Sequence, residues 1–145
     1  MSPEPDKPTQ PVPNETKAQK GNVLILDDDK FLIDMYGMKF TKQGYTIEAC
    51  LGVNDALQVL RGGFQADAIV FDILMPEHDG FDFLEVLKNE KLVGKAALIA
   101  LTNEGNDAQK ARVMALGTDR VIVKAMMIPS EVVEAVTEEI KKKKG

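Results

Sequence analysis

The feature that most constrains the fold of this chain is a regular alternation between short apolar runs and longer amphipathic segments. Continuous apolar runs such as "NVLIL" at residues 22–26 are typical of strands buried on both faces of a parallel sheet. Segments with apolar residues at three- and four-residue spacing are typical of helices, and several of them end at glycine. The alternation therefore predicts a doubly wound α/β fold, a parallel sheet with helices on both faces and right-handed crossovers.

The alternation repeats five times along the 145 residues. The predicted strands are residues 22–26, 45–50, 67–72, 96–102 and 120–124, and the predicted helices are residues 29–44, 53–63, 81–91, 106–117 and 129–144. Asn54 is the predicted N-cap of the second helix, and Pro129 suits the first turn of the fifth. We therefore expect a single domain in this sequence, with no second domain after the fifth helix.

The spacing of the apolar residues predicts which side chains form the core. In the first helix, the residues at helical spacing are Phe31, Leu32, Met35, Met38 and Phe40. Met114 in the fourth helix is also expected in the core, and Cys50 is expected to be a small buried apolar residue. Met126 and Met127 follow the last strand and are expected to be partly exposed.

The first 20 residues differ in composition from the rest. They are polar and rich in proline, so they cannot bury enough apolar surface to offset the entropy of ordering. We predict a disordered tail at residues 1–20 and one domain at residues 21–145. The segment lacks the apolar centre of a secretory signal, and no apolar run in the chain is long enough to span a membrane.

Composition narrows the class of partner and the compartment. The net charge of −5 argues against direct binding to nucleic acid. Because Cys50 is the only cysteine, the chain can form no internal disulfide and no cluster of thiolate ligands. The predicted location is the cytoplasm.

Polar residues stand at the carboxyl ends of the predicted strands, where open α/β sheets bind their ligands. The first strand is followed by the carboxylates Asp27, Asp28 and Asp29, the third ends in Asp72, the fourth in Thr102 and the fifth in Lys124. Any one of them has an ordinary explanation, as a helix cap, a turn residue or a surface lysine. Their coincidence at four strand ends points to one shared site.

The residue types at this edge suit one kind of chemistry. Carboxylates without histidine or thiolate partners are the ligands of a hard cation such as Mg²⁺. A hydroxyl and an ammonium group opposite them could hold the oxygens of a phosphoryl group. Asp72 could then be a metal ligand, a nucleophile that forms an acyl phosphate, or both.

These motifs resemble the receiver domains of two-component response regulators, over residues 22–142. The matching segments are "LILDDD", "IVFDILMPEHDG", "ALIALT" and "VIVK", and the most specific feature is Asp72 followed by Met75-Pro76 and Gly80. The resemblance implies a (βα)5, flavodoxin-like receiver fold. It also implies a protein that is not an enzyme for a separate substrate but catalyses its own phosphoryl transfer and dephosphorylation.

The resemblance also implies a role for each matching residue. Asp72 is the expected phosphoacceptor, taking its phosphoryl group from a histidine kinase or a histidine phosphotransferase. Asp28 is the expected direct Mg²⁺ ligand, Asp27 orients metal-bound water, and the backbone carbonyl of Leu74 is a further ligand. Thr102 and Lys124 are expected to contact phosphoryl oxygens, by a hydrogen bond and an ion pair. The output surface implied is the fourth helix, fifth strand and fifth helix.

Several positions depart from the pattern of the family. Ala125 follows Lys124 where a proline, commonly with a cis peptide bond, is usual, which leaves the direction of the lysine open. Val121 occupies the switch position, where an aromatic ring is common, so we expect an altered coupling to Thr102. Asn103 replaces a small residue. Leu74 and Glu104 occupy positions that tune hydrolysis of the acyl phosphate, and an apolar Leu74 predicts slow hydrolysis.

Other functions remain open at this stage. The chain could be a phosphorelay intermediate that passes the group to a second histidine, or a receiver cut from a larger protein. Asp27-x-Asp29 is the nucleophile arrangement of haloacid-dehalogenase phosphohydrolases, although the chain has no room for a cap domain. A phosphorylation-independent interaction module is a third class. His78 is expected to be a solvated loop residue, and the terminal lysines are expected to complement a helix end rather than bind lipid or nucleic acid.

Overall fold

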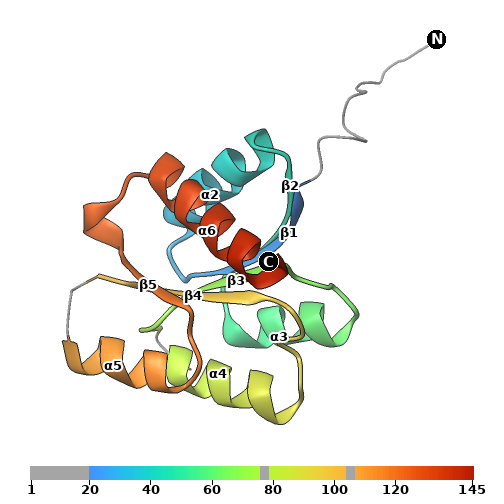
Figure 1. Cartoon of the computed structure of the whole chain (residues 1–145), viewed down its shortest axis with the longest axis vertical. Coiled ribbons are helices and arrows are strands. Elements are labelled where there is room, and N and C mark those ends of the chain that lie inside the picture. Colours follow the sequence, from blue (N-terminus) through green and yellow to red (C-terminus); the bar gives the residue numbers. More distant parts are fainter. Residues whose placement is uncertain (1–19, 76–78, 104–106) are drawn as a thin grey trace.

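The computed structural model describes residues 20–75, 79–103 and 107–145, and these form a parallel sheet between two layers of helices (Figure 1). The sheet has five strands in the order β2-β1-β3-β4-β5, all parallel to their neighbours. The strands are β1 (Gly21–Leu26), β2 (Tyr45–Cys50), β3 (Ala68–Asp72), β4 (Ala97–Thr102) and β5 (Arg120–Val123). The helices are α2 (Lys30–Lys42), α3 (Val53–Arg61), α4 (Gly80–Asn89), α5 (Asp107–Ala115) and α6 (Pro129–Lys144), and a 3₁₀ turn (Lys124–Met126) precedes α6. The predicted doubly wound sheet is confirmed.

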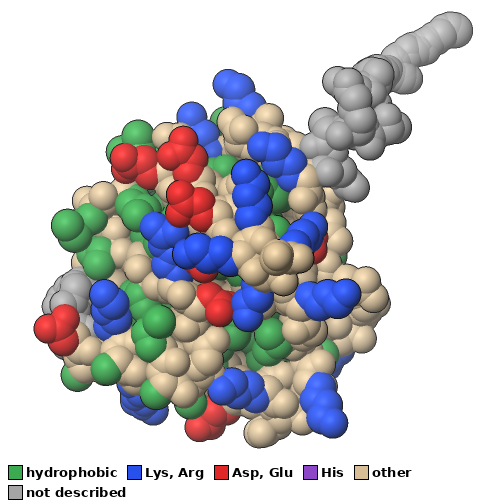
Figure 2. Space-filling model, in the orientation of Figure 1, with side chains coloured by type: hydrophobic (Ala, Val, Ile, Leu, Met, Phe, Trp, Pro, Cys, Tyr) green, Lys and Arg blue, Asp and Glu red, His purple; other side chains and the backbone are tan. Residues whose placement is uncertain are grey.

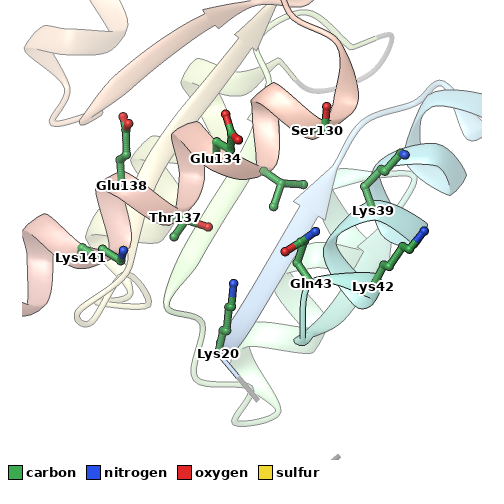
Figure 3. Close-up of a pocket in the computed structure, with 10 residues that line it drawn as sticks. Lys20, Lys39, Lys42, Gln43, Ser130, Glu134, Thr137, Glu138 and Lys141 are labelled. Atoms are coloured by element: carbon green, nitrogen blue, oxygen red, sulfur yellow. The ribbon is translucent and has the colours of Figure 1, made fainter. Parts of the chain in front are cut away.

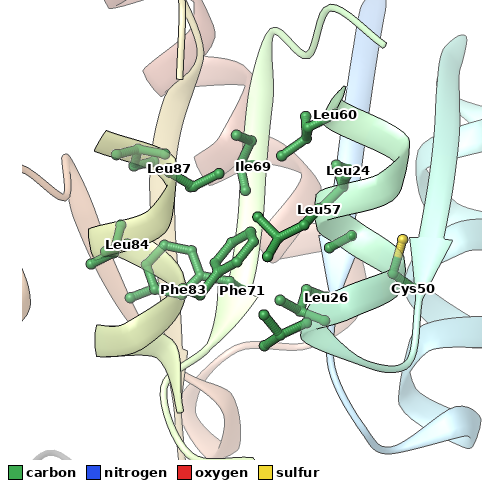
Figure 4. Close-up of a cluster of buried hydrophobic side chains, with 14 of the residues drawn as sticks. Leu24, Leu26, Cys50, Leu57, Leu60, Ile69, Phe71, Phe83, Leu84 and Leu87 are labelled. Atoms are coloured by element: carbon green, nitrogen blue, oxygen red, sulfur yellow. The ribbon is translucent and has the colours of Figure 1, made fainter. Parts of the chain in front are cut away.

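The strands divide the core into two halves because successive side chains point to opposite faces of the sheet. Leu24 and Leu26 of β1 join the cluster beneath α3, α4 and α5 (Figure 4). Val23 and Ile25 of the same strand join the cluster beneath α2 and α6. Burial on both faces explains why the strands read as continuous apolar runs.

The cluster beneath α3 and α4 contains the only cysteine. Cys50 lies among Leu57 and other aliphatic side chains, which confirms the prediction of a buried apolar role. Burial raises the pKa of its thiol to about 11, with a smaller contribution from the charges of Glu48 and Asp55. A thiol with so high a pKa has little thiolate at neutral pH and is unreactive.

The expected core residues of α2 are wrong in part. Phe31 and Met38 are 73% and 72% exposed, whereas Ile33, Tyr36 and Phe40 are buried against the sheet. The physical reason is that α2 carries two apolar stripes on nearly opposite faces, and both have helical spacing. Spacing alone does not tell which stripe packs on the sheet.

Two further local predictions are corrected. Met114 is 43% exposed, and Val113 is the residue of α5 that is buried. The N-cap of α3 is Gly52 rather than Asn54, and no side chain caps this helix end. The helix therefore begins at Val53, which is buried against the sheet, so packing rather than a polar cap sets the boundary. Met126, by contrast, is exposed and Met127 partly buried, as predicted.

Gly80, at the start of α4, lies unusually close to the end of β3. A Cβ atom at this position would stand 2.9 Å from both the carbonyl oxygen of Asp72 and the Cα of Ile73. The amide of Gly80 donates a hydrogen bond of 2.6 Å to the carbonyl of Ile73. A residue without a side chain is therefore needed for α4 to start directly beside the strand end that carries Asp72.

Candidate functional site

The sheet brings the predicted site residues to one edge. Asp27 follows the last residue of β1, Asp72 ends β3, and Thr102 ends β4. β1, β3, β4 and β5 are consecutive in the sheet, and Thr102 stands opposite Val123, the residue before Lys124. Parallel pairing thus collects residues that are far apart in the sequence.

Lys124 lies between the two buried carboxylates of this edge. Its Nζ is 2.7 Å from Oδ2 of Asp27 and 3.2 Å from Oδ2 of Asp72, and the latter contact is also a hydrogen bond. Burial lowers the pKa of Lys124, but its close contact with Asp27 and the charges of Asp72 and Asp27 raise it by more, so its pKa lies above the usual value. The ammonium group is therefore charged at neutral pH and directed at the carboxylates.

Lys124 points at the two carboxylates although alanine, not proline, follows it at position 125. The described residues contain no cis peptide bond, so the bond between Lys124 and Ala125 is trans. The chain continues from Lys124 directly into the 3₁₀ turn Lys124–Met126. The lysine reaches both carboxylates without the proline that is usual in the family.

Asp72 is almost completely buried, with 3% of its surface exposed. Its Oδ1 accepts a hydrogen bond of 3.3 Å from the backbone N–H of Leu74, and its Oδ2 pairs with Lys124. Burial raises the pKa of Asp72 to about 6, the charge of Asp27 adds to the rise, and Lys124 and the Leu74 amide oppose it. Asp72 is thus a strained carboxylate held in a fixed orientation.

Asp27 and Asp28 complete an acidic cluster with Asp72. One carboxylate oxygen from each of the three lies within 4.8 Å of the others. Asp27 is fully buried, and its Oδ1 accepts a hydrogen bond of 2.9 Å from the amide of Asp29, while Asp28 is exposed. Within the described residues, Oδ2 of Asp27 has no hydrogen bond of good geometry, so its contact with Lys124 is an ion pair only.

This cluster fits a divalent cation. The donors are all carboxylate oxygens, which is the ligand type that Mg²⁺ prefers. Two of the three carboxylates are buried, so they repel each other strongly, and the buried Oδ2 of Asp27 accepts no hydrogen bond from the described residues. A cation at this point would offset the repulsion.

Asp29 is set apart from this cluster by its role in α2. Its side chain accepts a hydrogen bond of 3.1 Å from the amide of Leu32 and forms the N-cap of the helix. Asp29, the third aspartate of "LDDD", is therefore a helix cap, which is the ordinary explanation given for such a residue in the sequence analysis. The same contact directs one oxygen of the Asp29 carboxylate to the helix end rather than to Asp27.

The remaining predicted residues lie near this edge. Thr102 is 5% exposed, and Asn103 beside it is exposed. Val121 is partly buried and packs against the cluster beneath α3 and α4. The side chain of Leu74 is 52% exposed, two residues beyond Asp72. His78 and Glu104 lie outside the described residues.

Sequence reasoning missed one buried residue, Tyr36, whose pKa the charges of the site affect. Tyr36 is 1% exposed on the buried face of α2. Burial raises the pKa of its hydroxyl, Lys124 opposes the rise, and the charges of Asp27, Asp29 and Asp72 add to it. Its position three residues after Ile33 and four before Phe40 was the available signal, because these three residues form the buried stripe.

Comparison with known proteins identifies the family to which this arrangement is similar. A sequence model of the response regulator receiver domain matches residues 23–137. Among curated proteins, the response regulator SaeR of Staphylococcus aureus (strain USA300) is 28% identical over 103 residues, which cover 71% of this chain and 43% of SaeR. The chain thus spans less than half the length of the curated relatives it matches.

Solved structures show the same fold. A receiver domain protein (CheY-like) from Methanospirillum hungatei JF-1 superposes with a TM-score of 0.76 at 24% identity, over 85% of this chain and 95% of that one. The receiver domain of Francisella response regulator 1452 gives a TM-score of 0.75 at 24% identity, over 85% and 98%. At this identity the similarity concerns the fold alone.

Proposed function

This chain belongs to the family of response regulator receiver domains, and we propose that it accepts a phosphoryl group on Asp72. The observation that carries the proposal is the position of Asp72, buried at the end of β3 between the ammonium group of Lys124 and the carboxylates of Asp27 and Asp28. Such a carboxylate is costly to keep in a fold unless the site uses it.

The proposed step is a transfer from a phosphohistidine. An oxygen of Asp72 attacks phosphorus, the bond between phosphorus and the imidazole nitrogen breaks, and the nitrogen keeps the electron pair and takes up a proton. The acyl phosphate that forms is a mixed anhydride. The hydrogen bond from the Leu74 amide to Oδ1 orients the carboxylate, which leaves Oδ2 on the side of Lys124.

Asp27, Asp28, Asp72 and the carbonyl of Leu74 are the residues that would hold Mg²⁺. When bound, the ion supplies positive charge that offsets the charge of the carboxylates and of the incoming phosphoryl oxygens. Lys124 supplies a second positive charge at the same point, and its contact with Asp72 Oδ2 supports a role as a phosphoryl ligand. Thr102 is proposed to donate its hydroxyl to another phosphoryl oxygen.

We expect no turnover of a separate substrate beyond loss of the phosphoryl group to water. Leu74 offers no polar group to orient an attacking water, and its side chain is 52% exposed beside Asp72. The acyl phosphate should therefore hydrolyse slowly. A half-life of seconds in the purified phosphoprotein would contradict this part of the proposal.

The phosphoryl donor is proposed to be a histidine kinase or a histidine phosphotransferase in the cytoplasm. Exposed apolar side chains lie within a few residues of the site in sequence, namely Phe31, Leu74, Met126 and Ile128. We propose that a donor protein contacts these exposed apolar side chains. The output surface is proposed to be α5, β5 and α6, with Val121 in place of an aromatic switch. A relay to a second histidine would use the same site.

The decisive experiment incubates the protein with Mg²⁺ and acetyl phosphate and maps the adduct by mass spectrometry. We expect one phosphoryl group on Asp72, absent from Asp72→Asn and from samples with EDTA. Asp34→Asn is the matched control, because Asp34 is exposed and pairs only with Lys30 among the described residues. This variant should be labelled like the wild type.

Other outcomes assign the other functions. A label on Asp27 would indicate an aspartate-nucleophile phosphohydrolase. The absence of any adduct, together with no change on addition of beryllofluoride, would indicate an interaction module that works without phosphorylation. Either result overturns the proposal.

A further inference from the structure

Most lysines near the end of α6 are neutralised by neighbouring carboxylates. Lys142 pairs with Glu139 at 3.3 Å, and Lys143 pairs with Asp119 at 3.2 Å. Lys144 lies 3.9 Å from Asp67. Three of the four terminal lysines, Lys142, Lys143 and Lys144, thus have a carboxylate partner.

Eight other lysines have no carboxylate partner among the residues that the structure describes. Four of these eight lie in one region, namely Lys20, Lys39, Lys42 and Lys141. All four line a single groove of about 430 Å³ between α2 and α6 (Figure 3). We refer to it as the α2–α6 groove. Figure 2 shows lysine side chains on this face, beside acidic side chains over the first half of α6.

The floor of the groove is built from packed residues. Val133 is 4% exposed, and the hydroxyl groups of Tyr45 and Thr137 lie 2.5 Å apart in a hydrogen bond. The Nζ of Lys20 stands 6.0 Å from the centre of the Tyr45 ring, and its backbone N–H donates to the carbonyl of Gly44 at 2.8 Å. One ammonium group of the groove, that of Lys20, therefore lies near an aromatic ring.

The walls carry polar groups of both kinds. Gln43 extends from α2 toward α6, and Ser130 and Glu134 stand on the α6 side (Figure 3). Glu138 also lines the groove, but its carboxylate pairs with Arg120 at 2.9 Å. The unpaired ammonium groups thus outnumber the unpaired carboxylates, and the groove has an excess of positive charge although the chain as a whole carries −5.

The favourable interaction of cations with helix C-termini explains the position of only some of these four lysines. Lys39 and Lys42 lie in the last turn of α2, where cations are favoured. Lys20 precedes β1 and belongs to no helix, yet it lines the same groove. Lys141 and Lys142 share the last turns of α6, but only Lys142 has a carboxylate partner among the described residues. Figure 3 shows the side chains of Lys39 and Lys42 directed away from α6, so Lys20 and Lys141 are the two unpaired lysines of the groove that remain to be explained.

We propose that the α2–α6 groove binds a phosphorylated small molecule of mononucleotide size. The phosphoryl oxygens pair with Lys20 and Lys141, and Gln43, Thr137 and Glu134 offer hydrogen bonds to the polar groups of the organic part. The volume is in the range of small-molecule sites.

The test titrates the full chain with AMP, and separately with adenosine, by calorimetry in buffer with EDTA. Chelation keeps Mg²⁺ from the aspartate cluster, so the result does not depend on phosphorylation of Asp72. We expect saturable binding of AMP and none of adenosine. Lys141→Ala and Lys20→Ala should each weaken AMP binding by about fivefold or more, since one charge-assisted contact is lost.

Lys142→Ala is the matched control, because it removes the same charge one position away from Lys141 and outside the groove lining. It should leave AMP binding within about twofold of the wild type. Three results would each overturn the proposal: no saturable binding of AMP, equal binding of adenosine, or an equal loss in Lys141→Ala and Lys142→Ala. Binding to phosphatidylserine vesicles without binding to AMP would indicate a membrane surface instead.

Discussion

At the scale of single residues, the molecule keeps a carboxylate where its charge is unfavourable. Asp72 has an ordinary pKa of 3.8 that rises to about 6 in the fold, first through burial and then through Asp27. The folded chain therefore binds this proton more tightly than the unfolded chain. Asp72 therefore contributes most to stability below pH 3.8, where it is protonated in both states. This contribution declines as the pH rises from 3.8 to about 6, and it is lowest above about pH 6, where the buried carboxylate is charged.

The Asp72→Asn variant should be more stable than the wild type at pH 7 in buffer without divalent cations. The amide removes the buried negative charge beside Asp27, and the lost contact with Lys124 offsets part of that gain. We expect the free energy of unfolding to rise by about 1 kcal/mol, measured by urea denaturation.

The pH dependence provides the check on this explanation. The gain should shrink when the pH is lowered to 4, where Asp72 is protonated in the folded wild type. Asp34→Asn, at an exposed position, should change stability little at either pH. A variant that is less stable than the wild type at pH 7 would mean that the pairing of Asp72 with Lys124 outweighs the repulsion.

At the scale of elements, α5 is lightly attached. Val113 is the buried residue of this helix in the described structure. A second contact is the guanidinium of Arg112, which lies 3.8 Å from the centre of the Phe81 ring at the start of α4. The helix that we propose as part of the output surface is therefore held by few contacts, as expected of an element that moves.

Arg112→Ala should loosen α5 selectively. Loss of the contact with Phe81 should lower stability by about 0.5–1 kcal/mol and speed amide hydrogen exchange in α5, with the sheet unaffected. Lys110→Ala, on the same helix and exposed, is the control and should change neither quantity. Equal exchange rates in Arg112→Ala and the wild type would show that the stacking contributes nothing to holding α5.

The junction between β3 and α4 should tolerate no side chain. In Gly80→Ala the new Cβ would stand 2.9 Å from backbone atoms of Asp72 and Ile73, so the chain must shift, at a cost of about 1–3 kcal/mol in stability. Gly37→Ala is the matched control, because Gly37 lies within α2 and a Cβ added there would meet no atom within 4 Å. It should stabilise the protein by about 0.5–1 kcal/mol, since alanine favours a helix. Equal effects of the two changes in a urea titration would contradict the steric explanation.

At the scale of the whole molecule, the aspartate cluster links metal binding to folding. Asp27, Asp28 and Asp72 come together only when β1 and β3 are paired, so the unfolded chain lacks the site. A cation that binds there stabilises the native state by mass action. Within the described part of the chain, every helix is too short or too polar to cross a bilayer.

Addition of Mg²⁺ should therefore raise the melting temperature, and EDTA should reverse the change. At ten times the dissociation constant the gain in stability is about 1.4 kcal/mol. Asp28→Asn should lose this response while keeping the stability of the metal-free protein, because Asp28 is exposed and carries no ion pair among the described residues. If Asp28→Asn responds to Mg²⁺ like the wild type, the ion binds elsewhere.

The pattern of apolar residues along the sequence was sufficient to predict most of the fold. Apolar runs and helical spacing predicted the order of strands and helices, because each element must hide an apolar face of its own period. The same reasoning brought Asp27, Asp72, Thr102 and Lys124 to one edge, since parallel strands present their carboxyl ends together. The fold and the composition of the candidate site were thus determined by the sequence alone.

Packing decided what local pattern left open. α2 has two apolar stripes, and only contact with the sheet and α6 selected Ile33 over Phe31 for the interior. The direction of Lys124 and the presence of Lys20 and Lys141 in one groove likewise depend on residues distant in sequence. Spacing along the chain describes each element separately, whereas these contacts arise between elements, so only the tertiary structure determines them.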